Sequence, residues 1–504
     1  MSSIEELRAR LAEIDDLSNA AELLGWDERV MMPAAAAEAR ADQLATLAKV
    51  RHEIFSDGRI GALLEEAEPE PGTIDADLVR VTSRDWEKTR LVDSELRAEM
   101  AKASMVAERA WVDARRESDW VALLPHLERN FELARRFAAC YERFPGFEHP
   151  YDPLLDEFEP EMSTAQMRTV LAELRDGLLP LVAEIGDPDD QEPDHFRGEF
   201  AAGPQRELMK EVLAELPFPE GSWRVDETEH PFAFSVGHGD IRMTTRYDED
   251  NLAFGLFSGI HEAGHGLYEA GVDPELARTP LATLRSLGLH ESQSRLLENW
   301  VGRDRPYLDH LLPLLAERFP DPFASLSLDR VCAAANRVER TLIRTEADEV
   351  TYNVHILIRF ELEVELFEGA VTIAELPKTW NARYRDYLGL DVPDDARGVL
   401  QDPHWAAGAF GYFPTYSLGN MIAAQLFDAA RRDIPDLETR IAAGELAPLG
   451  EWLREHVHRH GRRLTPAQIL ERSGCGELSA EPLLEHLRAR LAIRAPSSGA
   501  AGGA

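Results

Sequence analysis

The residues with the clearest chemical potential in this chain are two histidines four positions apart, His261 and His265, with Glu262 beside the first. On a helix, positions i and i+4 lie on one face, so the two imidazoles can bind the same metal ion. Glu262 then faces a metal-bound water instead of the metal itself. This is the H-E-x-x-H arrangement of zinc peptidases, in which the glutamate is the general base. The pattern is short and can arise by chance. The hypothesis that the protein is a hydrolase therefore requires that another segment of the chain supply the remaining metal ligand.

A catalytic zinc usually has three protein ligands and a water, so a third ligand must come from another segment. Glu269 is eight residues from His261, roughly 12 Å along a helix axis, which is too far for ligand bonds of about 2 Å. Glu291 is the better candidate, because it begins a second helical pattern that can pack beside the first. Alternatively, Glu291 could be an acid near the start of a helix that only stabilises the helix dipole. We predict zinc bound by His261, His265 and Glu291, with cobalt or manganese as possible substitutes.

The elements that must position these residues are mainly helices, because apolar residues recur at three- and four-residue spacing among Glu, Arg and Ala. One region just ahead of His261 alternates instead, over 232–236 and 241–245, and predicts a β-hairpin. Its edge could bind an extended peptide by strand addition, or the hairpin could only cover the helical core. The segments expected to be helical are 4–22, 36–54, 77–116, 118–143, 164–185 and 204–215.

The bulk composition restricts partners and location. The 504 residues include 92 acidic and 54 basic ones, and the net charge of −38 argues against binding to nucleic acid or anionic membranes. The three cysteines are far apart, which fits a reducing cytoplasm. No secretory signal and no membrane span is expected. We expect a single domain over 1–494 and a disordered tail over 495–504.

Six short motifs occur in order along the chain: 230–232 (H-P-F), 240–244 (D-x-R-x-T), 261–265 (H-E-x-x-H), 290–293 (H-E-S-Q), 343–348 (I-R-x-x-A-D) and 398–405 (G-x-x-Q-D-x-H-W). Together they resemble the carboxypeptidase Taq family of metallocarboxypeptidases, over about 24–419. The resemblance implies a mainly α-helical, zincin-like (neurolysin-like) fold with a small β-sheet beside a deep active-site cleft. It also implies a homodimer that removes C-terminal residues from peptides with a free C-terminus, with broad side-chain preference.

The resemblance also suggests which residues act on the peptide bond. Glu262 would take the proton of the metal-bound water and deliver it to the leaving amine. The oxyanion needs hydrogen-bond donors opposite the metal, and His404 with Tyr416 or Tyr412 are the candidates. We prefer Tyr416 for this role, and we expect Tyr412 to contact the substrate. His404 could instead be a buried structural histidine.

A carboxypeptidase must also recognise a terminal carboxylate, and the planar fork of an arginine suits that task. Arg344 and Arg242 lie in matching motifs. We predict that Arg344 is the carboxylate clamp and that Arg242 is a supporting charge in the cleft. The alternative for each is an internal ion pair, for instance Arg344 with Asp348 and Arg242 with Asp240.

Two other functions stay open at this point. A zinc endopeptidase or dipeptidase of the thermolysin-like class would keep Glu262 and the three ligands but lack the arginine clamp. A non-enzymatic scaffold with a structural metal would normally offer four protein ligands, and the sequence supplies three. Arg295 stands four residues beyond Glu291, where many thermolysin-like enzymes have an acid. The sequence therefore assigns no partner to the metal-binding histidines.

Overall fold

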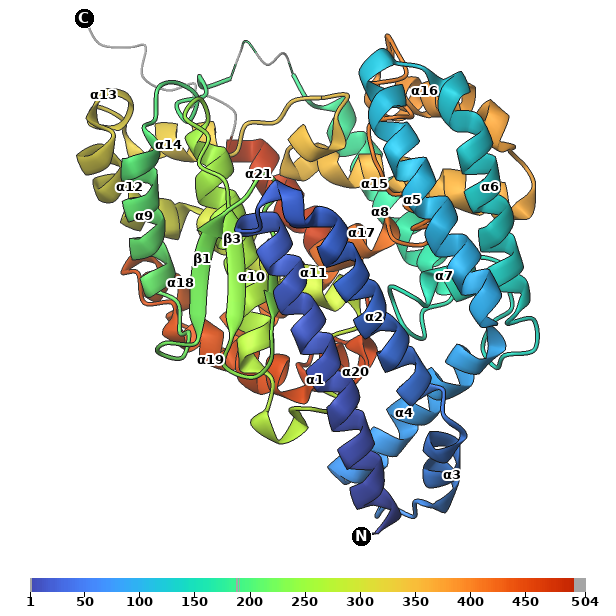
Figure 1. Ribbon diagram of the computed structural model, residues 1–504. Helices are drawn as coiled ribbons and strands as arrows, with labels where there is room; N and C mark the ends of the chain where they lie inside the picture. Colours follow the sequence, from blue (N-terminus) through green and yellow to red (C-terminus); the bar gives the residue numbers. More distant parts are fainter. Residues whose placement is uncertain (1, 187–188, 190, 494–504) are drawn as a thin grey trace, which may run out of the picture.

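The computed structural model describes residues 2–186, 189 and 191–493, so the predicted disordered tail at 495–504 lies outside the described residues. The fold is mainly helical with a small sheet, as predicted (Figure 1). The first third of the chain is entirely helical in its regular elements: α1 (Ser3–Val30), η1 (Ala34–Ala36), α2 (Ala37–Phe55), α3 (Gly58–Glu66), α4 (Ile74–Leu91), α5 (Ser94–Glu117), α6 (Trp120–Ala139), α7 (Asp152–Leu155) and α8 (Thr164–Ala183).

The predicted helix over 77–116 is wrong in one respect, because the structure divides it into α4 and α5. Asp93 has an extended backbone, and its side chain accepts a hydrogen bond from the backbone N–H of Leu96. An aspartate in this position starts a new helix. The apolar spacing continues across the break, since Val92 and Leu96 are both buried, and that continuity hides the break in the sequence pattern.

The sheet contains the predicted hairpin and one strand that was not predicted. Strands β2 (Ala233–Ser235) and β3 (Ile241–Thr245) pair antiparallel, with Phe234 opposite Arg242. Strand β1 (Trp223–Glu227) pairs parallel with β3, so β3 is central and β2 is an edge strand. The sheet packs against α10 (Leu252–Gly271), which follows helix α9 (Ala202–Ala214) and the sheet in the chain (Figure 1).

Three helices meet closely around the predicted site: α10, α11 (Leu287–Arg295) and α17 (Pro414–Asp433). Two glycines permit this approach. A Cβ at Gly264 would lie 2.5 Å from the Cα of Ser294, and one at Gly419 would lie 2.7 Å from the Cβ of Glu291. Real Cβ atoms essentially never come this close to other atoms. The two glycines therefore let α11 lie directly between α10 and α17, which places Glu291 beside the histidines of α10.

The remaining elements enclose these three helices. Most buried apolar residues between Val92 and Leu487 form one cluster. A smaller cluster joins α1, α3 and α4 to the loop after α10, and Leu284 packs against both clusters. The single domain over 1–494 stays a prediction. The other elements are η3 (Pro274–Leu276), η4 (Leu296–Gly302), α12 (Arg305–Arg318), α13 (Pro320–Phe323), α14 (Leu328–Ala335), η5 (Arg344–Glu346), α15 (Glu349–Glu368), η6 (Ile373–Glu375), α16 (Leu376–Leu388), α18 (Leu437–Ala442), α19 (Ala447–His456), η7 (His458–Arg463), α20 (Pro466–Arg472) and α21 (Glu481–Ile493).

Cys140, Cys332 and Cys475 are all unpaired thiols. Among the described residues, no helix combines the length and the apolar character that crossing a membrane requires.

Candidate active site

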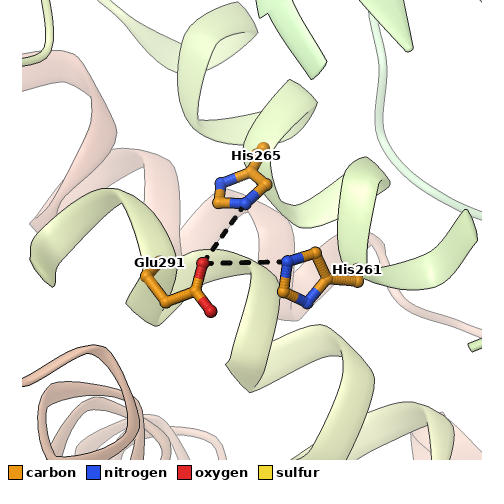
Figure 2. A group of neighbouring side chains, drawn as sticks. All are labelled: His261, His265 and Glu291. Carbon is orange, nitrogen blue, oxygen red and sulfur yellow. Dashed lines mark ion pairs between the residues drawn. The ribbon is translucent and has the colours of Figure 1, made fainter. Parts of the chain in front are cut away.

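The three predicted metal ligands come together in the structure. Nε2 of His261 lies 3.7 Å from Oε2 of Glu291, and Nε2 of His265 lies 3.5 Å from the same oxygen. Figure 2 shows the carboxylate of Glu291 facing both imidazoles from the neighbouring helix. One donor atom of each residue falls within 4.8 Å of the others. Two imidazole nitrogens and one carboxylate oxygen in this arrangement suit a divalent ion such as zinc.

Each of the two candidate metal-binding histidines has a hydrogen-bond partner on its other ring nitrogen. Nδ1 of His261 lies 2.9 Å from Oε2 of Glu298, and Nδ1 of His265 lies 2.6 Å from Nδ1 of His290. Metal-binding histidines usually have such partners, which orient the ring. The sequence left both partners unassigned. Glu298 stands seven residues beyond Glu291, about two helical turns, and that spacing was the signal that could have identified it.

Arg295 balances the two carboxylates of the site. Its Nε lies 2.7 Å from Oε1 of Glu291, and its Nη1 lies 3.2 Å from Oε2 of Glu298. Burial is the largest single influence and raises the pKa of both carboxyls, but Arg295 and the neighbouring histidines together outweigh it, with Arg303 adding to the effect on Glu298; the pKa of Glu298 falls to about 2 and that of Glu291 falls well below its usual range. Burial lowers the pKa of His265 to about 3. Anionic carboxylates and the neutral imidazole of His265 are the protonation states that metal binding requires. Burial lowers the pKa of His261, but Glu291 and Glu298 outweigh burial and raise it, so a divalent ion would have to displace the proton of this imidazole.

Glu262 is buried beside the donors, and its side chain is only 7% exposed. Within the described part of the chain, its Oε2 has no hydrogen-bond partner. Burial raises the pKa of this carboxyl to about 7. A buried carboxylate oxygen without a partner is rare in folded proteins and calls for an explanation. An atom that meets a water or a substrate group during the reaction is such an explanation.

A second group of candidate residues lies around His404. Nε2 of His404 lies 3.3 Å from the hydroxyl of Tyr416, and the ring of Tyr412 lies 5.2 Å from the imidazole. Burial, partly offset by Asp402, lowers the pKa of His404 to about 4. Burial also raises the pKa of both tyrosines, and the charge of Glu291 adds to this effect. The His404 group therefore lies within electrostatic reach of the metal ligands.

The loop that carries His404 is held by Glu363, a residue that the sequence analysis did not single out. Glu363 Oε1 accepts a hydrogen bond from Nε1 of Trp405 at 2.7 Å. Its Oε2 accepts from the backbone N–H of Gly411 at 3.0 Å and from the hydroxyl of Tyr151 at 2.5 Å. One buried carboxyl thus fixes the loop before and after the turn that leads to Tyr412.

The two predicted arginines have different surroundings. Arg344 is buried and pairs with Asp402 through Nε and Nη2, both at 2.9 Å, so the suggested pairing with Asp348 is wrong. Asp348 instead caps the start of α15. Nη1 of Arg344 lies 3.1 Å from the hydroxyl of Tyr352, whose ring also contacts Arg295.

Arg242 forms the internal ion pair that was considered as its alternative. Its Nε and Nη2 bind the two carboxylate oxygens of Asp240 at 2.5 and 2.9 Å. Its guanidinium also lies 4.7 Å from the ring centre of Trp26 in α1. The structure therefore brings Arg344 to the His404 group and Arg242 to the interface between the sheet and α1.

A large cavity reaches Glu269 on the helix that carries the two histidines, but His261, His265 and Glu291 are not among its lining residues. Its volume is about 950 Å³, and its lining comes from α1, α2, the β2 edge over 234–238, the loop over 272–285 and Glu269 of α10. The edge strand of the hairpin thus faces the cavity, as peptide binding by strand addition would require. The helical fold and the His–His–Glu donor set together match a metallopeptidase.

Comparison with known proteins gives the family. The model of the carboxypeptidase Taq (M32) metallopeptidases matches residues 6–491. Thermostable carboxypeptidase 1 of Thermus thermophilus is 40% identical over 94% of this chain and 96% of its own, and carboxypeptidase 1 of Bacillus subtilis is 36% identical over 95% of each. The crystal structure of an M32 carboxypeptidase from Deinococcus radiodurans aligns with a TM-score of 0.93 at 37% identity, over 97% of this chain and 98% of that one.

The chain belongs to the carboxypeptidase Taq (M32) family and is therefore a metal-dependent carboxypeptidase, a peptide hydrolase. The reading of a non-enzymatic scaffold is wrong. The family also favours a carboxypeptidase over the alternative of an endopeptidase or dipeptidase of the thermolysin-like class.

Proposed function

We propose that the enzyme removes C-terminal residues of many kinds from peptides, with Glu262 as the general base and zinc as the metal. The observation that carries the proposal is the unpartnered, buried carboxylate oxygen of Glu262 next to the donors of His261, His265 and Glu291. Cobalt and manganese accept the same nitrogen and oxygen ligands, and metal analysis of the purified enzyme identifies the ion.

The residues of the site divide the chemistry between them. A divalent ion held by His261, His265 and Glu291 would supply the Lewis acidity needed for water activation and for polarisation of the scissile carbonyl. Glu262 accepts the proton of the attacking water and passes it to the leaving amine. His404 and Tyr416 donate hydrogen bonds to the developing oxyanion. The low pKa of His404 and the high pKa of Tyr416 keep both groups neutral at pH 7.

Recognition of the free C-terminus is proposed for Arg344. Asp402 occupies the edge of the guanidinium formed by Nε and Nη2, while Nη1 binds the hydroxyl of Tyr352 on another side. The edge between Nη1 and Nη2 can still meet a carboxylate, with the orientation fixed by Asp402. Tyr412 would contact the substrate beside Arg344. We propose a supporting role for Arg242, whose partner Asp240 lines the cavity.

Paired substrates with a free or an amidated C-terminus test the proposed function. The loss of a charge-assisted hydrogen bond costs about 1.5–3 kcal/mol, so Arg344→Ala should lower kcat/KM for the free acid at least roughly tenfold. The penalty should nearly vanish for the amidated peptide, which the wild-type enzyme already cleaves poorly. Arg242→Ala is the matched control. If Arg242→Ala shows the substrate-dependent loss and Arg344→Ala shows none, the two roles must be exchanged.

The breadth of specificity, the assembly and the location are further parts of the proposal. A time course of residues released from a mixed peptide set tests broad side-chain preference. We propose a homodimer in the cytoplasm. The exposed apolar side chains of Met105, Val106 and Val112 on α5 and Val121 on α6 offer contact surface for a second copy. Sedimentation velocity of the purified enzyme tests the dimer.

A further inference from the structure

Three side chains form a continuous line of hydrogen bonds that ends at a metal-binding histidine. Oε1 of Glu269 lies 3.0 Å from Nε2 of His290. Nδ1 of the same imidazole lies 2.6 Å from Nδ1 of His265, whose Nε2 faces Glu291. All three side chains of the line are largely buried. Glu269 lies too far along the helix to bind the metal itself. It contacts the site through His290 instead.

The positions of the protons along this line follow from the geometry. Two ring nitrogens at hydrogen-bond distance require one donor and one acceptor. If Nε2 of His265 gives its lone pair to the metal, Nδ1 of His265 must carry the hydrogen and donate it. Nδ1 of His290 is then the acceptor, so Nε2 of His290 carries its hydrogen and donates it to Glu269. Only this order satisfies every group in the line with neutral imidazoles.

The second metal-binding histidine is oriented in a different way. His261 donates directly to the carboxylate of Glu298, which also binds Arg295. For His265, the imidazole of His290 lies between the ligand and the carboxylate of Glu269. The ring of His290 stacks on the ring of His265 at 4.5 Å between centroids and at an angle of 28°, and it also lies 5.5 Å from the ring of Tyr268. Packing on these two rings keeps His290 in the orientation that the hydrogen bonds need.

We propose that His290 and Glu269 are positioning residues for the metal: His290 holds His265 in the tautomer and orientation that present Nε2, and Glu269 holds His290. The inference rests on the proposed ligand set. Partners of metal ligands typically contribute 10–100-fold to metal affinity or activity. Loss of either His290 or Glu269 should therefore weaken metal binding measurably, and the two effects should be coupled.

The test is the dissociation constant for Zn²⁺, measured by competition with a chromophoric chelator. His290→Ala should weaken binding about 10–100-fold. His290→Gln should give an intermediate value, because an amide offers an acceptor and a donor in the same order as the imidazole. Glu269→Ala should weaken binding in the wild-type background and have no further effect in the His290→Ala background, since the line is already broken there.

The controls separate failure of this inference from failure of the ligand set. His310→Ala removes a histidine with its own carboxylate partner, Glu215, away from the metal, and it should leave the Zn²⁺ affinity unchanged. Thermal unfolding of each metal-free variant shows that the fold is retained. If Glu291→Ala binds Zn²⁺ as tightly as the wild type, the ligand set is wrong. If Glu291→Ala loses Zn²⁺ but His290→Ala stays within about threefold of the wild type, or if the His290 and Glu269 effects simply add, the positioning role is overturned.

Discussion

Gly264 lies between the two metal-binding histidines on α10, where the helix touches the backbone of α11. A Cβ at this position would lie 2.5 Å from the Cα of Ser294 and 2.7 Å from the carbonyl carbon of Gln293. Both are backbone atoms of the helix that carries Glu291, so neither can rotate away as the end of a side chain can. Gly264→Ala should therefore force α10 and α11 apart and move Glu291 away from the histidines.

The size of the effect follows from these contacts. Ordinary contact of a Cβ begins near 3.4 Å, so the helices must separate by about 1 Å. Metal–ligand distances in working sites stay within about 0.2 Å of their normal values, and a misplacement of about 1 Å can cost about 10²-fold in rate. Overpacking costs about 1–3 kcal/mol in stability, and the better helix propensity of alanine offsets up to about 1 kcal/mol. The variant should fold and yet lose metal affinity and about 10²-fold in kcat/KM.

Gly266→Ala, two residues further along α10, is the matched control. Its Cβ would meet Sδ of Met243 at 2.9 Å, and this flexible side chain can shift. Both variants gain the same helix propensity, so their difference isolates the contact between α10 and α11. The assay combines kcat/KM, Zn²⁺ affinity and the melting temperature of the metal-free protein. Equal activity and equal affinity in the two variants would refute the argument that close helix packing at Gly264 places Glu291.

Two further predictions concern buried carboxyl groups. Glu262→Gln should retain the metal but lower kcat by about 10²–10⁴-fold, the usual contribution of a general base; elemental analysis with steady-state kinetics tests this, and a variant with near wild-type turnover would exclude the role. Burial raises the pKa of Glu363 from 4.5 to about 7, so the folded protein holds this proton more tightly than the unfolded chain. Its contribution to stability is present below pH 4.5 and is lost as the pH rises to about 7. Glu363→Gln should therefore reduce the fall in melting temperature across this range, and an unchanged pH profile would show that another group titrates there.

Local patterns in the sequence were sufficient to predict those parts of the structure that depend only on neighbouring residues. The four-residue spacing of His261 and His265 places both imidazoles on one helix face whatever the rest of the fold does. Alternation and a glycine-containing turn likewise predicted the pairing of β2 with β3. Helical spacing identified most of the early helices but missed the short helices α3 and α7. It also missed the break at Asp93, because the cap is a single-residue signal within a continuous apolar pattern.

The ordered motifs extended this to the family and singled out Glu291 as the candidate third ligand. A helix reach of roughly 12 Å ruled out Glu269, so the third ligand had to come from a different segment. What brings that segment close is the pair of glycines on α10 and α17, Gly264 and Gly419. Their role is invisible in the sequence, because a glycine inside a helix is informative only when the atoms facing it are known.

The tertiary structure decided which acid each of the two arginines, Arg344 and Arg242, pairs with. Arg344 has an acid four residues away, yet it pairs with Asp402, 58 positions distant. Arg242 does pair with its near neighbour Asp240. The sequence shows acids near each arginine and far from it along the chain, and it does not show which one lies close in the fold. An ion pair depends on distance and burial in space and not on separation along the chain. The same reason explains why the sequence determined which residues could bind the metal, while only the packing of α10 against α11 and η4 brought Glu298 and His290 within hydrogen-bond distance of them.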